Sequence, residues 1–115
     1  MNFWQNWGMP KYVQAKPEPS QEASEVIELF GMTPLRAQIL RHLSMCEEGV
    51  TSGDVGRSLS ANYRTVARHL VMLESHGVVE SDATEERQGV RVLYRINRAQ
   101  LSAAAKLLLK YLHGE

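Results

Sequence analysis

Apolar residues near the start of the chain recur with the period of a helix and predict two helices. Ser20 can cap the first helix, and Gly31 is expected to end it in a left-handed conformation. The apolar face of this helix is Ala23, Val26, Ile27 and Phe30. Thr33 can cap the second helix, with Pro34 in its first position. Its buried stripe is expected at Leu35, Ile39, Leu40 and Leu43.

The pattern of apolar and polar residues over 51–77 predicts a short helix, a tight turn and a longer helix. Thr51 and Asp54 make a start that resembles a capping box, and the short helix is expected to end near Leu59. After the turn, Asn62 can cap a helix that runs to Gly77. Its buried side is expected to hold Val66, Leu70 and Leu73.

Two strands and a last helix complete the pattern. Val78–Glu80 and Val90–Ile96 predict strands, joined by a polar turn at 83–89. Asn97 can cap a helix that reaches about His113. The predicted fold class is therefore mainly α with a β-hairpin wing. It is a winged helix-turn-helix of order α-α-α-α-β-β-α over residues 20–113.

Residues 1–19 differ from this domain and are expected to form an N-terminal arm rich in aromatic residues and proline. They hold both tryptophans, Trp4 and Trp7, with Phe3, Tyr12 and three of the four prolines. One interpretation is a solvated tail. The other, which we favour, is an arm whose aromatic residues dock on this domain or on a protein partner, since solvated tails are poor in aromatic residues.

Length and composition indicate the number of domains and the cellular compartment. The chain has 115 residues, which suits one domain, and its formal net charge is zero. Its one cysteine, Cys46, excludes an internal disulfide and fits a reducing compartment. The sequence has no signal-peptide pattern and no apolar run long enough to span a membrane. We therefore expect a cytoplasmic protein.

Basic residues concentrate in the predicted helix-turn-helix and wing. Between positions 57 and 98 there are seven arginines and five acidic residues, whereas residues 1–30 hold two lysines and four glutamates. Donors cluster on the longer helix in its first two turns, away from its buried side, as readout of the major groove requires. The predicted DNA-binding residues are Asn62, Tyr63, Arg64, Thr65 and Arg68 of this helix, and Arg87, Arg91 and Arg95 of the wing.

Two segments resemble the ArsR-like winged helix-turn-helix regulators. Thr33–Leu40 (TPLRAQIL) matches the family's proline-led helix, with its arginine and Ile-Leu pair, and Thr65–Leu70 (TVARHL) matches its recognition helix. Leu73, Gly77 and the strand around Tyr94 continue the resemblance, which covers about residues 20–113. The resemblance implies a homodimeric transcriptional regulator, usually a repressor, whose first and last helices form the dimer interface.

The last predicted helix supports a dimer, because its apolar residues cover more than one face. A helix that packs only on its own domain needs a narrower stripe, and a small domain lacks the volume to bury all sides. The predicted homodimer interface comprises Val26, Leu101, Leu108, Leu109 and Leu112. A two-fold dimer would separate its recognition helices by about 34 Å and predicts a palindromic DNA site.

The sequence gives no sign of a metal site, another cofactor or an active site. The metal-sensing members of the family carry cysteine or histidine ligands that Ser52–Leu59 lacks, and the last helix has only His113. His69 is expected to be a semi-buried structural residue that hydrogen-bonds the backbone, and Cys46 either a small buried hydrophobe or a bystander without a role. We find no glycine-rich phosphate loop, no paired carboxylates in a cleft, and no nucleophile with a base. An enzyme is therefore not expected.

The leading hypothesis is a sequence-specific regulator of transcription that binds double-stranded DNA. Helix 62–76 would read the major groove, and wing 78–96 would contact the flanking backbone or the minor groove. Two alternatives stay open. One is a winged-helix module for protein–protein assembly that uses the tryptophan arm, and the other is a sensor that responds to a ligand or metal.

Overall fold

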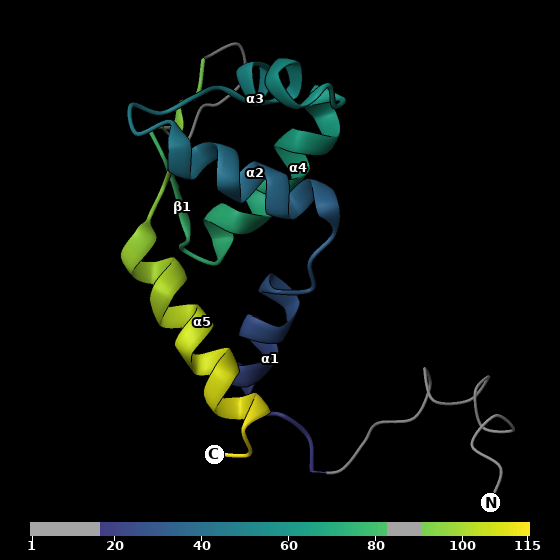
Figure 1. Cartoon of the computed structure of the whole chain (residues 1–115), viewed down its shortest axis with the longest axis vertical. Coiled ribbons are helices and arrows are strands. Elements are labelled where there is room, and N and C mark those ends of the chain that lie inside the picture. The colour runs from purple at the N-terminus through teal and green to yellow at the C-terminus, as the bar shows by residue number, and fades with distance from the viewer. Residues whose placement is uncertain (1–16, 83–90) are drawn as a thin grey trace, which may run out of the picture.

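The computed structural model describes residues 17–82 and 91–115, which form five helices and one two-stranded antiparallel sheet (Figure 1). In chain order the elements are α1 (Gln21–Leu29), α2 (Pro34–Met45), α3 (Ser52–Leu59), α4 (Tyr63–Ser75), β1 (Val79–Ser81), β2 (Tyr94–Ile96) and α5 (Arg98–Leu112). This order confirms the predicted winged helix-turn-helix architecture. The aromatic residues of the arm and Arg87 lie outside the described residues.

Every helix begins where the sequence predicts its cap. The side chains of Ser20, Thr33, Asn62 and Asn97 each accept a hydrogen bond from a backbone N–H two or three residues ahead. At α3, the Thr51 hydroxyl accepts from the Asp54 N–H over 3.0 Å, and the Asp54 carboxylate accepts from the Thr51 N–H over 3.1 Å. These reciprocal bonds form the expected capping box and satisfy two N–H groups at the helix start.

The end of α1 differs from the prediction, because Gly31 does not adopt a left-handed conformation. Arg36 of α2 takes over the capping role. Its Nη1 atom donates to the carbonyl oxygens of Glu28 over 3.1 Å and of Leu29 and Gly31 over 3.2 Å each. The carbonyls at a helix C-terminus lack partners within the helix and carry partial negative charge, so a guanidinium satisfies them well.

The first strand begins one residue later than predicted, at Val79, and the second is shorter than predicted. The register of the sheet pairs Val79 with Ile96, Glu80 with Arg95, and Ser81 with Tyr94. The prediction of a strand over Val90–Ile96 was therefore too long, since 91–93 lie outside the ladder and 90 is not described. At the next position, the Asp82 N–H donates to the Leu93 carbonyl over 3.2 Å, but the Leu93 N–H donates to the Asp82 carboxylate over 2.8 Å. This side chain accepts the bond that a backbone carbonyl would accept in a continuing ladder.

The other edge of β2 contacts the segment that precedes α3. The Val50 N–H donates to the Tyr94 carbonyl over 2.9 Å, and the Tyr94 N–H donates back to Val50 over 2.8 Å. This isolated bridge, which the sequence pattern did not reveal, joins the helix-turn-helix to the base of the hairpin.

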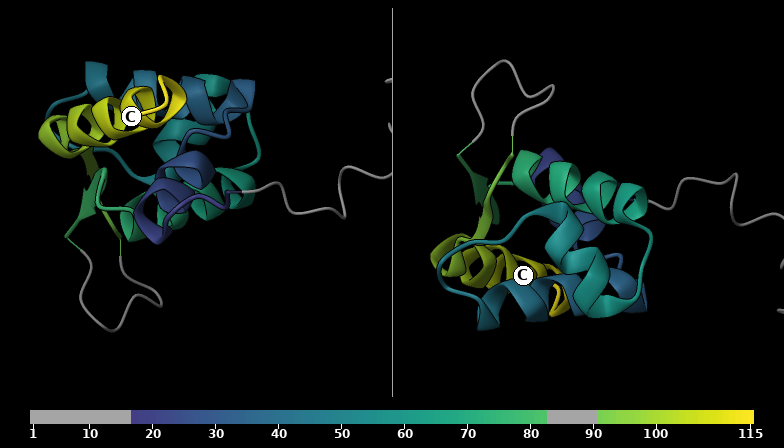
Figure 2. Two further views of the ribbon diagram at one scale, coloured as in Figure 1. Left: turned by 90° about the horizontal axis from the view of Figure 1, so that it is seen from below. Right: turned by 90° about the horizontal axis from the view of Figure 1, so that it is seen from above.

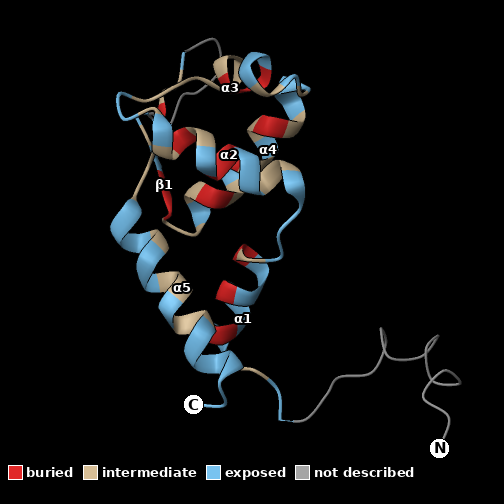
Figure 3. Ribbon diagram, viewed as in Figure 1, coloured by how far each residue is buried: buried red, intermediate tan, exposed pale blue. Residues whose placement is uncertain are grey.

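The core lies where α2, α3, α4 and β1 meet (Figure 3). Its buried residues are Leu29, Ile39, Leu40, Leu43, Val55, Val66, Leu70, Leu73, Val78, Val79 and Tyr94. Helix α5 has no fully buried residue. It packs against α1, and the two helices converge at the end of the molecule opposite α3 (Figure 1). In both end-on views the sheet lies at the side of the helices (Figure 2).

Within the described residues, the helices are too short or too polar to cross a bilayer.

Candidate nucleic-acid interface

The corner between α3 and α4 is built around Gly56. A Cβ atom at this position would lie 2.9 Å from the Ala61 carbonyl oxygen and 3.4 Å from the Tyr63 Cα. The Ala61 N–H donates to the Gly56 carbonyl over 2.9 Å, and Ser60 ends α3 with a left-handed φ of 52°. The chain of the turn therefore lies directly on α3, and this contact positions the start of α4.

The exposed face of α4 carries the predicted arginines. At about 100° per residue, Arg64 and Arg68 lie opposite the buried residues Val66, Leu70 and Leu73 of α4. Both arginines are exposed, and Tyr63 in the first turn is 56% exposed. The structure thus presents these donors to solvent on one surface at the beginning of the helix.

The side chains of Asn62 and Thr65 lie against other parts of the protein. The Asn62 side chain caps α4 by accepting a hydrogen bond from the Arg64 N–H over 2.8 Å. Thr65 is half-buried on the flank of α4 that faces α2. There it lines a shallow pocket with Arg36, Arg68, His69 and Met72.

Tyr63 and Arg64 contact each other at the start of α4. The guanidinium carbon of Arg64 lies 5.9 Å from the centroid of the Tyr63 ring, and Arg64 Nε donates to the phenol oxygen over 3.4 Å. This hydrogen bond raises the pKa of Arg64 above its ordinary value. The tyrosine therefore helps to orient a permanent cation beside the pocket described next.

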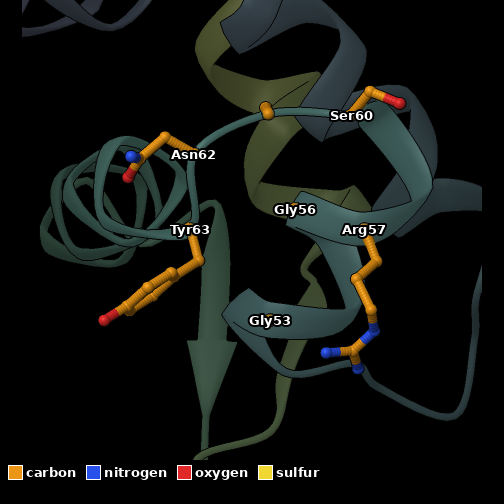
Figure 4. Close-up of a pocket in the computed structure, with 7 residues that line it drawn as sticks. Gly53, Gly56, Arg57, Ser60, Asn62 and Tyr63 are labelled. Atoms are coloured by element: carbon orange, nitrogen blue, oxygen red, sulfur yellow. The ribbon is translucent and has the colours of Figure 1, made fainter.

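A shallow pocket separates the start of α4 from α3 (Figure 4). Its lining residues are Gly53, Gly56, Arg57, Ser60, Ala61, Asn62 and Tyr63. The side chains of Arg57 and Tyr63 stand on two sides of this pocket and come from α3 and α4 respectively (Figure 4). Arg57 was not among the predicted DNA-binding residues. Its position opposite the buried Val55 on an amphipathic helix was the available signal.

Arg91 lies beside α3, where Arg91 and Arg57 both contact the carboxylate of Asp54. Its Nη2 atom is 3.9 Å from Asp54 Oδ2, while Arg57 Nη2 donates to Asp54 Oδ1 over 2.5 Å. Hydrogen bonds with the backbone and side chain of Thr51, and then Arg57, hold the pKa of Asp54 below its ordinary value. Asp54 is therefore ionised at neutral pH.

The predicted wing residue Arg95 is exposed on β2 and lies opposite Glu80.

The sequence suggested that His69 bonds the backbone, but in the structure it contacts a side chain. Its Nδ1 atom accepts a hydrogen bond from Arg36 Nε over 3.4 Å. Burial, and then the charge of Arg36, lower the pKa of His69, so the imidazole is neutral at pH 7.

Cys46 is half-buried, and its Sγ atom lies 3.7 Å from Nε2 of His42. Within 17–82 and 91–115, no three His, Cys, Asp or Glu side chains form a metal-binding group.

The five predicted interface residues occupy different environments on α1 and α5. Val26 is 7% exposed on α1, which packs against α5 of the same chain. Leu101 and Leu108 are half-buried. Leu109 and Leu112 are 52% and 64% exposed, although both side chains are large and apolar.

One family model matches most of the chain. Residues 32–106 match the model described as a winged helix DNA-binding domain. No curated protein matches the sequence.

Solved structures with the same fold include DNA-binding regulators. An ArsR-like transcriptional regulator from Rhodococcus sp. RHA1 is 23% identical with a TM-score of 0.59, and 81% of each chain is covered. A homodimeric winged helix-turn-helix domain from Mycobacterium bovis, described as possibly of the ArsR family, is 24% identical with a TM-score of 0.56. Coverage is 82% of this chain and 80% of that one.

The third structure contains DNA. MepR from S. aureus, solved as a DNA complex, is 20% identical with a TM-score of 0.51, and 81% of this chain and 72% of that chain are covered. At these identities the similarity shows a shared fold. It agrees with the resemblance to ArsR-like regulators found in the sequence.

Proposed function

Because this chain belongs to the winged helix DNA-binding domain family, we propose that it is a sequence-specific, homodimeric repressor of transcription. The observation that carries this proposal is the position of Arg64 and Arg68. Both are exposed on α4, opposite its buried stripe, and close to the start of the helix. Such a helix can enter the major groove while its other face stays anchored to the domain.

The first two turns of α4 would read the DNA sequence. Arginine can form two parallel hydrogen bonds with the O6 and N7 atoms of guanine, so Arg64 and Arg68 are the proposed base-reading residues. Asn62, Tyr63 and Thr65 carry polar groups on neighbouring positions and would contact phosphates or base edges.

The wing would contact the DNA beside this site. Arg91 lies next to α3, and Arg87 precedes it along the chain, within the segment that the structure does not describe. Arginine side chains suit phosphate oxygens or a narrow minor groove, and phosphate contacts fix the register of the protein without specifying bases.

The dimer would form at the α1–α5 end. Leu109 and Leu112 expose apolar surface there, and the related fold from M. bovis is described as homodimeric. A two-fold axis at this end would direct two α4 helices toward successive major grooves, about 34 Å apart. A dimer bound in this way at a promoter would repress transcription by blocking access of the polymerase.

The double variant Arg64→Ala/Arg68→Ala tests the proposal. DNA sequences are first selected from a random pool with the wild-type protein, and affinity for the selected duplex is then measured by fluorescence anisotropy. Each lost arginine should cost about 1–3 kcal/mol, which is a loss of affinity of about fivefold to 150-fold for each residue.

Arg41→Ala is the matched control. Arg41 is an exposed arginine of α2, opposite that helix's buried stripe, so its removal takes away one charge, as do the single variants Arg64→Ala and Arg68→Ala, and spares the proposed site. If the double variant bound the selected duplex as tightly as wild type, or if Arg41→Ala weakened binding as much as either single variant, α4 would not be the reading helix.

A further inference from the structure

Asp54 is an acidic residue at the surface where the protein is proposed to bind DNA. Its carboxylate is 2.5 Å from Arg57 of α3 and 3.9 Å from Arg91 near β2. Arg57 lines the pocket next to Tyr63, which begins α4. The carboxylate therefore contacts two cations, and one of them, Arg57, lines the pocket at the start of the proposed reading helix.

The position of this carboxylate is fixed by the helix that carries it. Asp54 Oδ2 accepts from the Thr51 N–H over 3.1 Å, and the Asp54 N–H donates to the Thr51 hydroxyl over 3.0 Å. The side chain of Asp54 is 33% exposed, whereas those of Arg57 and Arg91 are each 75% exposed. A carboxylate held by backbone hydrogen bonding thus contacts two longer and more exposed cationic side chains.

These ion pairs reduce the charge available to DNA. Arg57, Arg91 and Asp54 together carry one net positive charge, where the two arginines alone would carry two. Affinity for DNA of any sequence depends on how many phosphates the protein neutralises. Arginines that are already paired with a carboxylate must exchange that partner for a phosphate, while the carboxylate repels the same phosphate.

We propose that Asp54 is a positioning residue that competes with DNA phosphate for Arg57 and Arg91, and so restrains the sequence-independent part of DNA binding. The inference rests on the proposed DNA-binding function. Exposed ion pairs of this kind are weak, which makes the exchange reversible and sensitive to salt. A repressor with this restraint spends less time on random DNA, which outnumbers its specific sites.

The experiment measures binding of the full chain to a random-sequence duplex at 0.05–0.3 M salt. Asp54→Asn removes the charge and keeps a side chain that can accept from Thr51. Asp54→Gln is a second neutral variant, because glutamine is common at this position of a capping box. We expect each variant to bind about five to ten times more tightly than wild type at 0.1 M salt, with a salt dependence steeper by about one phosphate or more.

Two further measurements separate competition from a general effect of charge or folding. Glu47→Gln is the matched control, because Glu47 is also exposed and pairs with an arginine, Arg98, over 3.5 Å, but lies at the end of α2. Its affinity should stay within about twofold of wild type, since a distant surface charge is largely screened. In the Arg57→Gln/Arg91→Gln background, the effect of Asp54→Asn should become much smaller, because only the direct repulsion between the carboxylate and phosphate remains; a double-mutant cycle measures this coupling.

The outcomes distinguish this inference from the proposed function. If wild type binds the duplex but both Asp54 variants bind equally or more weakly with the same salt dependence, the inference is wrong and the proposed function stands. An undiminished effect of Asp54→Asn without the two arginines would also contradict it. If wild type shows no binding at 0.05 M salt, the proposed function fails, and this inference fails with it.

Discussion

At the scale of single residues, Gly56 allows α3 and the turn before α4 to approach closely, because it has no side chain. We predict that Gly56→Ala lowers the free energy of unfolding by about 1–3 kcal/mol, as for other overpacked sites. The added methyl group would lie 2.9 Å from a carbonyl oxygen of the backbone, so the turn must move. Urea unfolding followed by circular dichroism measures the change, and the displaced α4 should also bind its selected DNA more weakly.

Gly53→Ala is the control within the same helix. A Cβ atom there would meet only the end of the Arg57 side chain and the Thr51 hydroxyl, at 3.4 Å and 3.8 Å. Alanine should therefore leave stability unchanged or raise it by about 0.5–1 kcal/mol, because glycine is the poorer helix former. Equal losses at both positions would contradict the assignment of close approach to Gly56.

His69 makes stability depend on pH. Burial and Arg36 lower its folded-state pKa below the value of about 6.5 for an unfolded chain. Its contribution is therefore fully present above pH 6.5 and is lost as the pH falls from there through the folded-state pKa, because the unfolded state binds the proton more readily. We predict that His69→Gln, which can still accept from Arg36, shows a smaller loss of stability than wild type between pH 7.5 and 5.5. Urea unfolding at both values tests this, and identical losses would refute it.

The residues that the sequence predicted best are those whose partners lie close along the chain. Ser20, Thr33 and Asn97 cap a helix by accepting from an N–H three residues ahead, so the partner is visible in the sequence. The partner of His69 is Arg36, which lies 33 residues away, and only the packing of α2 on α4 brings them together. The same arginine replaced Gly31 as the cap of α1, for the same reason.

At the scale of elements, Arg36 joins the end of α1 to the start of α2 and to α4. We predict that Arg36→Ala destabilises the protein by about 2 kcal/mol, because it removes charge-assisted hydrogen bonds to three carbonyls. Hydrogen exchange should accelerate most in α1, whose last turn loses its partners. Arg41→Ala, on the exposed side of the same helix, should change neither value. Exchange that accelerated in α4 but not in α1 would contradict the capping role.

The elements show why strand lengths were harder to predict than helix starts. Apolar alternation in Val90–Ile96 indicates a half-buried strand but not how far it pairs. The Asp82 side chain ends the ladder by accepting the Leu93 N–H, and Val50 occupies the other edge of Tyr94. Both contacts depend on how the hairpin meets the rest of the fold, which a pattern of neighbouring residues does not record.

At the scale of the whole molecule, the candidate DNA-binding surface and the exposed leucines lie at opposite ends. We predict that Leu109→Ser/Leu112→Ser weakens dimerisation by more than about a hundredfold. Burial of each leucine contributes about 1.5–3 kcal/mol, and both protomers lose two. Sedimentation equilibrium measures the dissociation constant. The variant monomer should keep its helical content, since neither side chain belongs to the core.

Met45→Ser is the matched control for this variant. Met45 is 67% exposed at the end of α2, so its replacement removes exposed apolar surface away from the proposed interface. The dimer should be unaffected. A double leucine variant that stayed dimeric, or a wild type that was monomeric at micromolar concentration, would refute the proposed assembly.

The sequence predicted the architecture of the molecule more completely than its surfaces. Five amphipathic helices and a hairpin leave few ways to bury their apolar faces, so the winged helix-turn-helix followed from pattern alone. Surface residues lack this constraint. Thr65 is half-buried whereas Arg64 is exposed, and Val26 is buried whereas Leu109 and Leu112 are exposed, so the pattern alone did not rank the accessibility of these residues.

The closure of the hairpin by Asp82 has a consequence for how this protein can vary in evolution or be engineered. Because the Asp82–Leu93 pair ends the ladder through a side chain, the pairing of β1 with β2 is completed before the intervening residues begin. Lengthening the connection between two paired strands costs little, about 0.6 kcal/mol for each doubling. Insertions or grafted peptides between these two residues are therefore the changes that the fold should tolerate best, provided that Asp82 is kept.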